Sequence, residues 1–231
     1  MSRTANLVVW LAGLAALVVT TVSTITLAKD PVETPRGPMA MTLRVRDYSH
    51  LNRSILLGAE QEATGILAQA GVSARWTDCP TSPGDLASFP NCQPPWQAND
   101  YVMNVIPDSM AVLLGKSDDA LGLATECGMG PSCTASVFFD RVSKLAGGDR
   151  ASAQVVLGRA MAHELGHLLL GANSHSPTGI MRGHWSPREF RLDARLDLLF
   201  TTGQSRRMKT RLAEREQLSL AKAKVAEIGH R

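Results

Sequence analysis

The sequence predicts an α+β fold, in which a mixed β-sheet packs against one long helix and is followed by a helical C-terminal part. The chain of 231 residues has 44% hydrophobic and 19% charged residues, the composition of one globular domain with tails. Strand-like runs before residue 140 enclose one amphipathic helical run, and a long apolar helical segment follows. This order is typical of a sheet with helices packed against it.

The first half of the domain shows the strand pattern most clearly. Apolar and charged residues alternate over 41–48, MTLRVRDY, as in a half-buried strand. An amphipathic helix is predicted over 54–70 and a second strand over 72–77. Residues 78–99 are rich in Pro, Asn and Asp and are predicted to form a loop, and 101–106, YVMNVI, to form a central strand.

Two helices are predicted near the C-terminus. The first runs from Ser186 to about residue 199, with leucines on one side. The second covers 204–227 and carries a basic series: Arg206, Arg207, Lys209, Arg211, Arg215, Lys222 and Lys224. We expect it to be solvated and to bury a narrow stripe of Met208, Leu212 and Val225; a membrane-surface or partner contact is the alternative.

The N-terminus predicts export. Arg3 is followed by a charge-free, largely apolar run from Ala5 to Ala28, which fits a signal peptide over 1–28 or an uncleaved membrane anchor. Residues 29–38 form a proline-rich linker, 39–202 the predicted domain and 203–231 a basic C-terminal helix. The domain is therefore expected to be secreted, periplasmic, or held outside the cytoplasm by the anchor. The small net charge of +3 does not favour nucleic acid as a partner, and the oligomeric state is left open.

The four cysteines fit an oxidising compartment. They lie in Pro/Gly-rich sequence, and their even number predicts two disulfides between sequence neighbours: Cys79 with Cys92, and Cys127 with Cys133. A second zinc site is the rival interpretation, although no CxxC spacing is present.

The pentapeptide His163-Glu164-Leu165-Gly166-His167 lies inside the long apolar helix. Histidines four residues apart stand on one helix face, so both imidazoles can bind one ion, and Glu164 lies beside them. We expect Ser152 to cap the N-terminus of this helix and Gly171 to end it.

The residues that follow the pentapeptide resemble the metzincin class of zinc metallopeptidases. In that class a glycine ends the helix, a third histidine ligand follows, and a methionine turn lies beneath the metal. Ser176-Pro-Thr-Gly-Ile-Met181 is similar to that turn, with the methionine spacing of matrixin-type members. The resemblance implies a zincin-like α+β fold, in which the strand over 135–139 borders the substrate cleft.

The third ligand departs from the metzincin pattern HExxHxxGxxH. That pattern requires glycine at 170 and histidine at 173, whereas this chain has Leu170 and Asn173, with Gly171 and His175 displaced towards the C-terminus. His175 is the predicted ligand, because an amide binds zinc poorly. A gluzincin-type arrangement would use Glu189 instead, and His184 is the next candidate.

The resemblance implies an exported zinc-dependent endopeptidase acting on a protein or peptide substrate. Zn²⁺ held by His163, His167 and His175 would activate a water, with Glu164 as general base. Met181 is expected to pack beneath the site. The alternatives are the gluzincin-type peptidase and a non-catalytic zinc-binding protein on the same fold.

Overall fold

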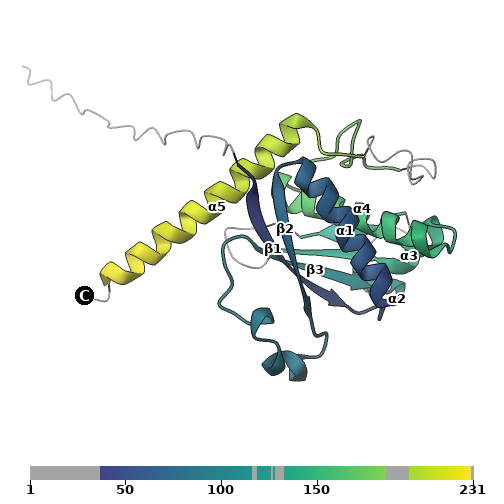
Figure 1. Ribbon diagram of the computed structural model, residues 1–231, viewed down its shortest axis with the longest axis horizontal. Helices are drawn as coiled ribbons and strands as arrows, with labels where there is room; N and C mark the ends of the chain where they lie inside the picture. Colours follow the sequence, from purple (N-terminus) through teal and green to yellow (C-terminus); the bar gives the residue numbers. More distant parts are fainter. Residues whose placement is uncertain (1–36, 116–118, 126, 128–132, 186–197, 230–231) are drawn as a thin grey trace, which may run out of the picture. The chain divides into compact units, whose positions relative to one another are not determined.

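The computed structural model describes residues 37–115, 119–125, 127, 133–185 and 198–229, which form a five-stranded mixed sheet with helices (Figure 1). The strands are β1 (Met39–Asp47), β2 (Val72–Cys79), β3 (Asp100–Ile106), β4 (Gly122–Ala124) and β5 (Thr134–Phe138). The helices are α1 (Arg53–Gln69), α2 (Asp108–Leu113), α3 (Phe139–Leu145), α4 (Arg150–Leu170) and α5 (Thr202–Gly229), with 3-10 turns η1 (Pro83–Ser88) and η2 (Pro90–Cys92). The predicted α+β class, a mixed sheet with an active-site helix and a helical C-terminal part, agrees with this architecture.

The sheet has the strand order β2-β1-β3-β5-β4. Neighbouring strands are parallel from β2 to β5, and only β4 runs antiparallel to its neighbour β5. The expectation that the strand over 135–139 borders a cleft is therefore wrong. The chain folds back after β3 and adds the three-residue β4 outside β5, so β4 is the edge strand and β5 lies inside the sheet.

Helices α1 and α4 lie side by side in Figure 1 and contact each other. Asn52 caps α1, because its side-chain oxygen accepts a hydrogen bond from the backbone N–H of Ser54 at 3.0 Å. Between the two helices, the fully buried Arg159 of α4 is 3.2 Å from the carboxylate of Glu62 of α1. This ion pair helps to fix α4 against the rest of the domain, since a buried charge requires a partner.

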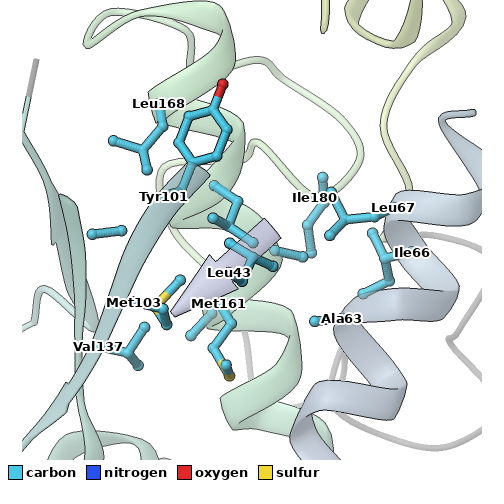
Figure 2. Close-up of a cluster of buried hydrophobic side chains, with 14 of the residues drawn as sticks. Leu43, Ala63, Ile66, Leu67, Tyr101, Met103, Val137, Met161, Leu168 and Ile180 are labelled. Carbon is cyan, nitrogen blue, oxygen red and sulfur yellow. The ribbon is translucent and has the colours of Figure 1, made fainter. Parts of the chain in front are cut away.

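The core lies between the sheet and these two helices. On the core face of β1, Met41, Leu43 and Val45 are buried as the alternation predicts, but Arg44 between them is buried as well, so the strand is not half-exposed throughout. Figure 2 shows Leu43 of β1 and Met103 of β3 gathered with Met161 of α4 and Ala63 of α1. The apolar surface of α4 thus faces the sheet. The histidine pair lies in the C-terminal half of the same helix.

Helix α4 begins three residues earlier than predicted. Asp149, and not Ser152, is the N-cap, and its carboxylate accepts a hydrogen bond from the backbone N–H of Ser152 at 2.7 Å. The correction has a simple cause: a carboxylate three residues ahead satisfies the free N–H of the first turn. The predicted C-terminus is confirmed, since Gly171 has a φ of +102° that other residues rarely adopt.

Both predicted disulfides are present, Cys79 with Cys92 and Cys127 with Cys133. No described helix is long and apolar enough to cross a membrane. The predicted signal peptide or anchor over 1–28, most of the 29–38 linker and nearly all of the predicted helix from Ser186 lie outside the described residues.

Helix α5 has two different halves. In the first, Met208 and Leu212 are fully buried, as predicted, and Gln204 and Arg215 are buried on the same side. In the second, every residue from 216 to 226 is exposed. The prediction that Val225 belongs to the buried stripe is wrong, because it is 71% exposed and no described element covers that half of the helix.

Glu60 is a buried carboxyl group on α1. It is 7% exposed, and its Oε1 has no hydrogen-bond partner. Burial, with a smaller contribution from nearby Asp78, raises the pKa of Glu60 from 4.5 to about 7. The folded state therefore keeps this proton at pH values where the unfolded state has released it, so the group's contribution to stability is present below pH 4.5 and is lost as the pH rises towards 7.

We predict that Glu60→Gln removes this loss. Relative to wild type, the free energy of unfolding should rise by about 1 to 3 kcal/mol at pH 8 and change little at pH 4.5. Urea unfolding at both pH values measures this, with Glu216→Gln at an exposed position of α5 as the control for charge. An equal effect at the two pH values would contradict the assignment.

Candidate metal centre

The last two turns of α4 place two imidazoles on one face of the helix. His163 and His167 are four residues apart, and their Nε2 atoms are 3.0 Å from each other. His163 is buried and His167 partly buried, so both rings face the interior of a cleft. This is the pair that the helical spacing predicts.

His175 brings a third imidazole to the same point. Its Nε2 lies 3.1 Å from the Nε2 of His167, and the three rings offer ligand atoms that all lie within 4.8 Å of one another. The chain leaves the helix axis at Gly171, and the loop that follows carries His175 back over α4. Asn173, at the position where the metzincin pattern has its histidine, is exposed. The described residues thus contain a three-histidine cluster that can hold a metal ion.

Hydrogen bonds outside the cluster orient the rings. Nδ1 of His163 donates to the carbonyl of Ile180 at 2.8 Å, and Nδ1 of His167 lies 3.0 Å from the hydroxyl of the buried Ser174. A neutral imidazole that donates from Nδ1 presents the lone pair of Nε2 on its other side. For His163 that side faces the other two histidines. Neither partner is predictable from the sequence, since the Ile180 carbonyl leaves no signal there and Ser174 reaches His167 only through the fold of the loop after α4.

Burial keeps the two helical histidines neutral. It lowers the pKa of His163 to about 4, and it also lowers the pKa of His167. Neutral imidazole is the form that binds a metal ion. Protons therefore do not compete for these two nitrogens near pH 7.

The cluster fits zinc. Tetrahedral zinc with Zn–N bonds of about 2.0 to 2.1 Å separates its nitrogen ligands by roughly 3.3 Å, close to the 3.0 and 3.1 Å between the Nε2 atoms here. Converging lone pairs repel one another unless a cation or a proton lies between them. A set of three imidazoles also suits zinc better than it suits the oxygen-seeking ions calcium and magnesium.

Glu164 lies in the same cleft as the cluster. A cleft of about 980 Å³ is lined by Glu164, by all three histidines and by the three residues of β4, and we call it the Glu164 cleft. The carboxylate packs against the edge strand so closely that a Cβ at Gly122 would lie 2.6 Å from Oε1. Only glycine leaves this room at 122, and the sequence does not predict it, because β4 has too few residues to show a strand pattern.

Met181 packs beneath the histidine pair. It is fully buried, and a Cβ at Gly166, between the two histidines, would lie 2.3 Å from its sulfur. Since Ile180 holds His163, the segment that ends at Met181 supports α4 from below. The predicted packing role of Met181 agrees with this position.

Other predicted candidates fall into two groups. His184 lines the Glu164 cleft, together with Trp185, whose ring stands edge-on to His163 with centroids 5.3 Å apart. His184 is not a member of the described metal cluster. Glu189, the ligand of the gluzincin-type alternative, lies outside the described residues.

We predict that Gly166→Ala destabilises the protein although alanine favours a helix. The new methyl group would meet Met181 at 2.3 Å and Phe200 at 2.8 Å, so we expect the free energy of unfolding to fall by about 1 to 3 kcal/mol. The matched control is Gly65→Ala in α1, where no atom lies within 4 Å; it should gain up to about 1 kcal/mol. Denaturant unfolding of both variants measures this, and a gain at both positions would show that Met181 does not press on the helix.

Comparison with known proteins gives limited similarity. No protein-family model matches the chain, and no curated protein matches it. Among solved structures, the chain is similar to the crystal structure of metalloproteinase-II from Bacteroides fragilis, with 15% sequence identity and a TM-score of 0.45. The match covers 79% of this chain and 57% of that one, so this chain spans little more than half of that protein's length.

Proposed function

We propose that this protein is an exported zinc-dependent endopeptidase. The observation that carries the proposal is the convergence of the Nε2 atoms of His163, His167 and His175 in the cleft that also holds the Glu164 carboxylate. Three imidazole ligands and one carboxylate that is not a ligand are the set that a catalytic zinc site of a hydrolase requires, since a coordination position stays open for water or substrate.

The three histidines hold the metal in this proposal. His163 and His167 are kept neutral by burial, and the hydrogen bond to Ile180 fixes the tautomer of His163 with Nε2 directed at the ion. Bound zinc supplies the Lewis acidity that makes a water nucleophilic near neutral pH and polarises the scissile carbonyl.

Glu164 acts as the general base. Its carboxylate lies at the edge strand β4, in the cleft where the three histidines converge, so it can take the proton of the attacking water and pass it to the leaving amine. Its position between α4 and β4 restricts its rotation. The base is therefore held near the reacting atoms before substrate binds.

Strand β4 provides a binding surface for an extended peptide. It has β5 on one side, and no described strand pairs with the other. A peptide that enters the Glu164 cleft can add its backbone to this edge, which would bring a peptide bond beside Glu164.

Export is supported by the two disulfides, since such bonds persist in oxidising compartments. The apolar N-terminal segment supports it as well. We propose that the domain works outside the cytoplasm, either released by cleavage of the segment over 1–28 or tethered by it.

We predict that Glu164→Gln keeps the metal and loses the activity. Loss of a general base lowers kcat by about 10²- to 10⁴-fold, whereas zinc content per chain should not change because Glu164 is not a ligand. Digestion of casein and mixed peptides, beside metal analysis of the same sample, measures both, with Glu216→Gln as the control. Activity within about threefold of wild type would rule out the mechanism. Bound zinc in a wild-type protein that cleaves nothing would favour a non-catalytic zinc-binding protein.

We predict that His175→Ala weakens zinc binding by about tenfold or more, because it removes one of three ligands. Asn173→Ala, an exposed change in the same loop, should leave the affinity within about twofold. Competition with a chromogenic chelator measures both. A third variant, Glu189→Ala, separates the alternatives: if it strips the metal while His175→Ala does not, the site is gluzincin-like.

A further inference from the structure

We propose that a groove beside the metal centre binds a carboxylate of the substrate, through arginines of α5. The inference rests on the proposed peptidase function and adds the substrate class to it: acidic peptides, with the negative charge on one side of the cleaved bond. It depends on the position of one face of α5, which the proposed mechanism does not use.

The groove adjoins the metal centre. It has a volume of about 1200 Å³ and is lined by His167 and His175, by the loop after α4 and by α5; we call it the arginine groove. It shares its two histidines, Ala124 and Ala172 with the Glu164 cleft. A peptide lying across the metal centre therefore has the Glu164 cleft on one side and the arginine groove on the other.

The core contact of α5 decides which side chains face this groove. Gln204, Met208, Leu212 and Arg215 are buried, at intervals of four, four and three residues, so one stripe of the helix is fixed against the domain. Besides Gln204, which lies at the border, the groove is lined by the neighbouring stripe of the same helical turns: Gly203, Arg206, Arg207, Thr210, Arg211 and Glu214. The rotation of the helix is thus set by packing, and its arginines are placed at the groove as a result.

The charge of this stripe is unbalanced. Three guanidinium groups face the groove against one carboxylate, that of Glu214. Within the part of the chain that the structure describes, no carboxylate is within ion-pair distance of Arg206, Arg207 or Arg211. Arg211 is half-buried and donates to the carbonyl of Cys127 at 3.3 Å, which holds its guanidinium at the groove wall.

The Glu164 cleft has no such excess of positive charge. Its lining has three aspartates and Glu164 against three basic side chains, the histidines aside: Asp108, Asp119 and Asp140, with Arg141, Lys144 and Arg182. The electrostatic potential therefore changes across the metal centre, and a peptide with its negative charge on the arginine side is favoured over the reverse orientation.

A carboxylate is the ligand that suits the side of the arginine groove formed by α5. Guanidinium stays charged at all relevant pH values and offers paired N–H donors that match the two oxygens of a carboxylate. Two sources supply that group, an Asp or Glu side chain and the free C-terminus of the substrate. The shared chemistry defines the site, and the experiment below separates the two sources.

The first measurement is binding without turnover. Zinc-loaded full-length protein carrying Glu164→Gln is titrated with four peptide pools that share the same randomised flanks. Three pools are amidated and carry Glu, Gln or Lys at one fixed position; the fourth has neutral side chains and a free C-terminal carboxylate. We expect either the Glu pool or the free-acid pool to bind about tenfold more tightly than the Gln pool, and the preference to shrink as NaCl rises from about 0.05 to 0.5 M.

Charge-reversal variants locate the effect. Arg206→Glu with Arg207→Glu should abolish the preference; both side chains are exposed, so the fold should tolerate the change. Lys222→Glu with Lys224→Glu makes the same change of net charge on the exposed half of α5, outside the groove lining, and should keep the preference. Circular dichroism and zinc content confirm that each variant is folded and loaded. Arg211→Gln, which removes the third arginine of the groove, should also weaken the preference for a carboxylate.

The outcomes separate this inference from the proposed function. No preference for a carboxylate, or an equal loss in the arginine and lysine variants, overturns the inference even if wild type cleaves peptides. A preference that the arginine variant alone removes supports it, even if wild type cleaves nothing and the peptidase proposal fails. Where wild type does cleave, kcat/KM should favour acidic residues on one side of the bond only, and equal effects on both sides would contradict the groove assignment.

Discussion

The hydrogen bond from Nδ1 of His163 to the carbonyl of Ile180 links the two segments on which the three-histidine cluster depends. It joins α4 to the chain that returns beneath it, and Met181 reinforces the link by packing against Gly166 in the same helical turn. Because this returning segment is held in place, the loop that precedes it is anchored at one end by α4 and at the other by Ile180 and Met181. His175 lies in that loop, so one buried polar contact and one close packing contact together determine where the third imidazole can lie.

The centre also carries an energetic cost that a bound metal would offset. Two of the three histidines are removed from water and held neutral, with their Nε2 atoms 3.0 Å apart. Bringing lone pairs together in this way is unfavourable, whereas a cation bound between them is strongly stabilised. Metal binding and the folding of the loop over 171–175 should therefore be coupled. The disulfide to Cys133 restrains Cys127, which lines the arginine groove, so covalent and polar restraints both act around the site.

The arginines inside the domain differ in their pairing from those at the groove beside the histidine cluster. Two buried arginines of the domain are paired with carboxylates: Arg159 with Glu62 between the helices, and Arg44 with Asp100, 2.9 Å apart, across neighbouring strands. The arginines at the groove have no such carboxylate partner in the described part of the chain. Paired charges stabilise the domain without creating a field outside it, while unpaired ones leave a positive potential beside the metal centre.

The sequence by itself determined the features that depend on local spacing. The pairing of His163 with His167 follows from the helical repeat, the alternation of β1 from the pleat, and both disulfides from short separations along the chain. Only the tertiary structure decided the rest. Edge strand β4 is three residues long and is defined by its neighbour β5, the partners of the histidine Nδ1 atoms include backbone carbonyls, and the arginines of α5 face the groove because Met208 and Leu212 are buried on an adjacent stripe. These features arise from contacts between segments far apart in the chain, which a local pattern of residues cannot specify.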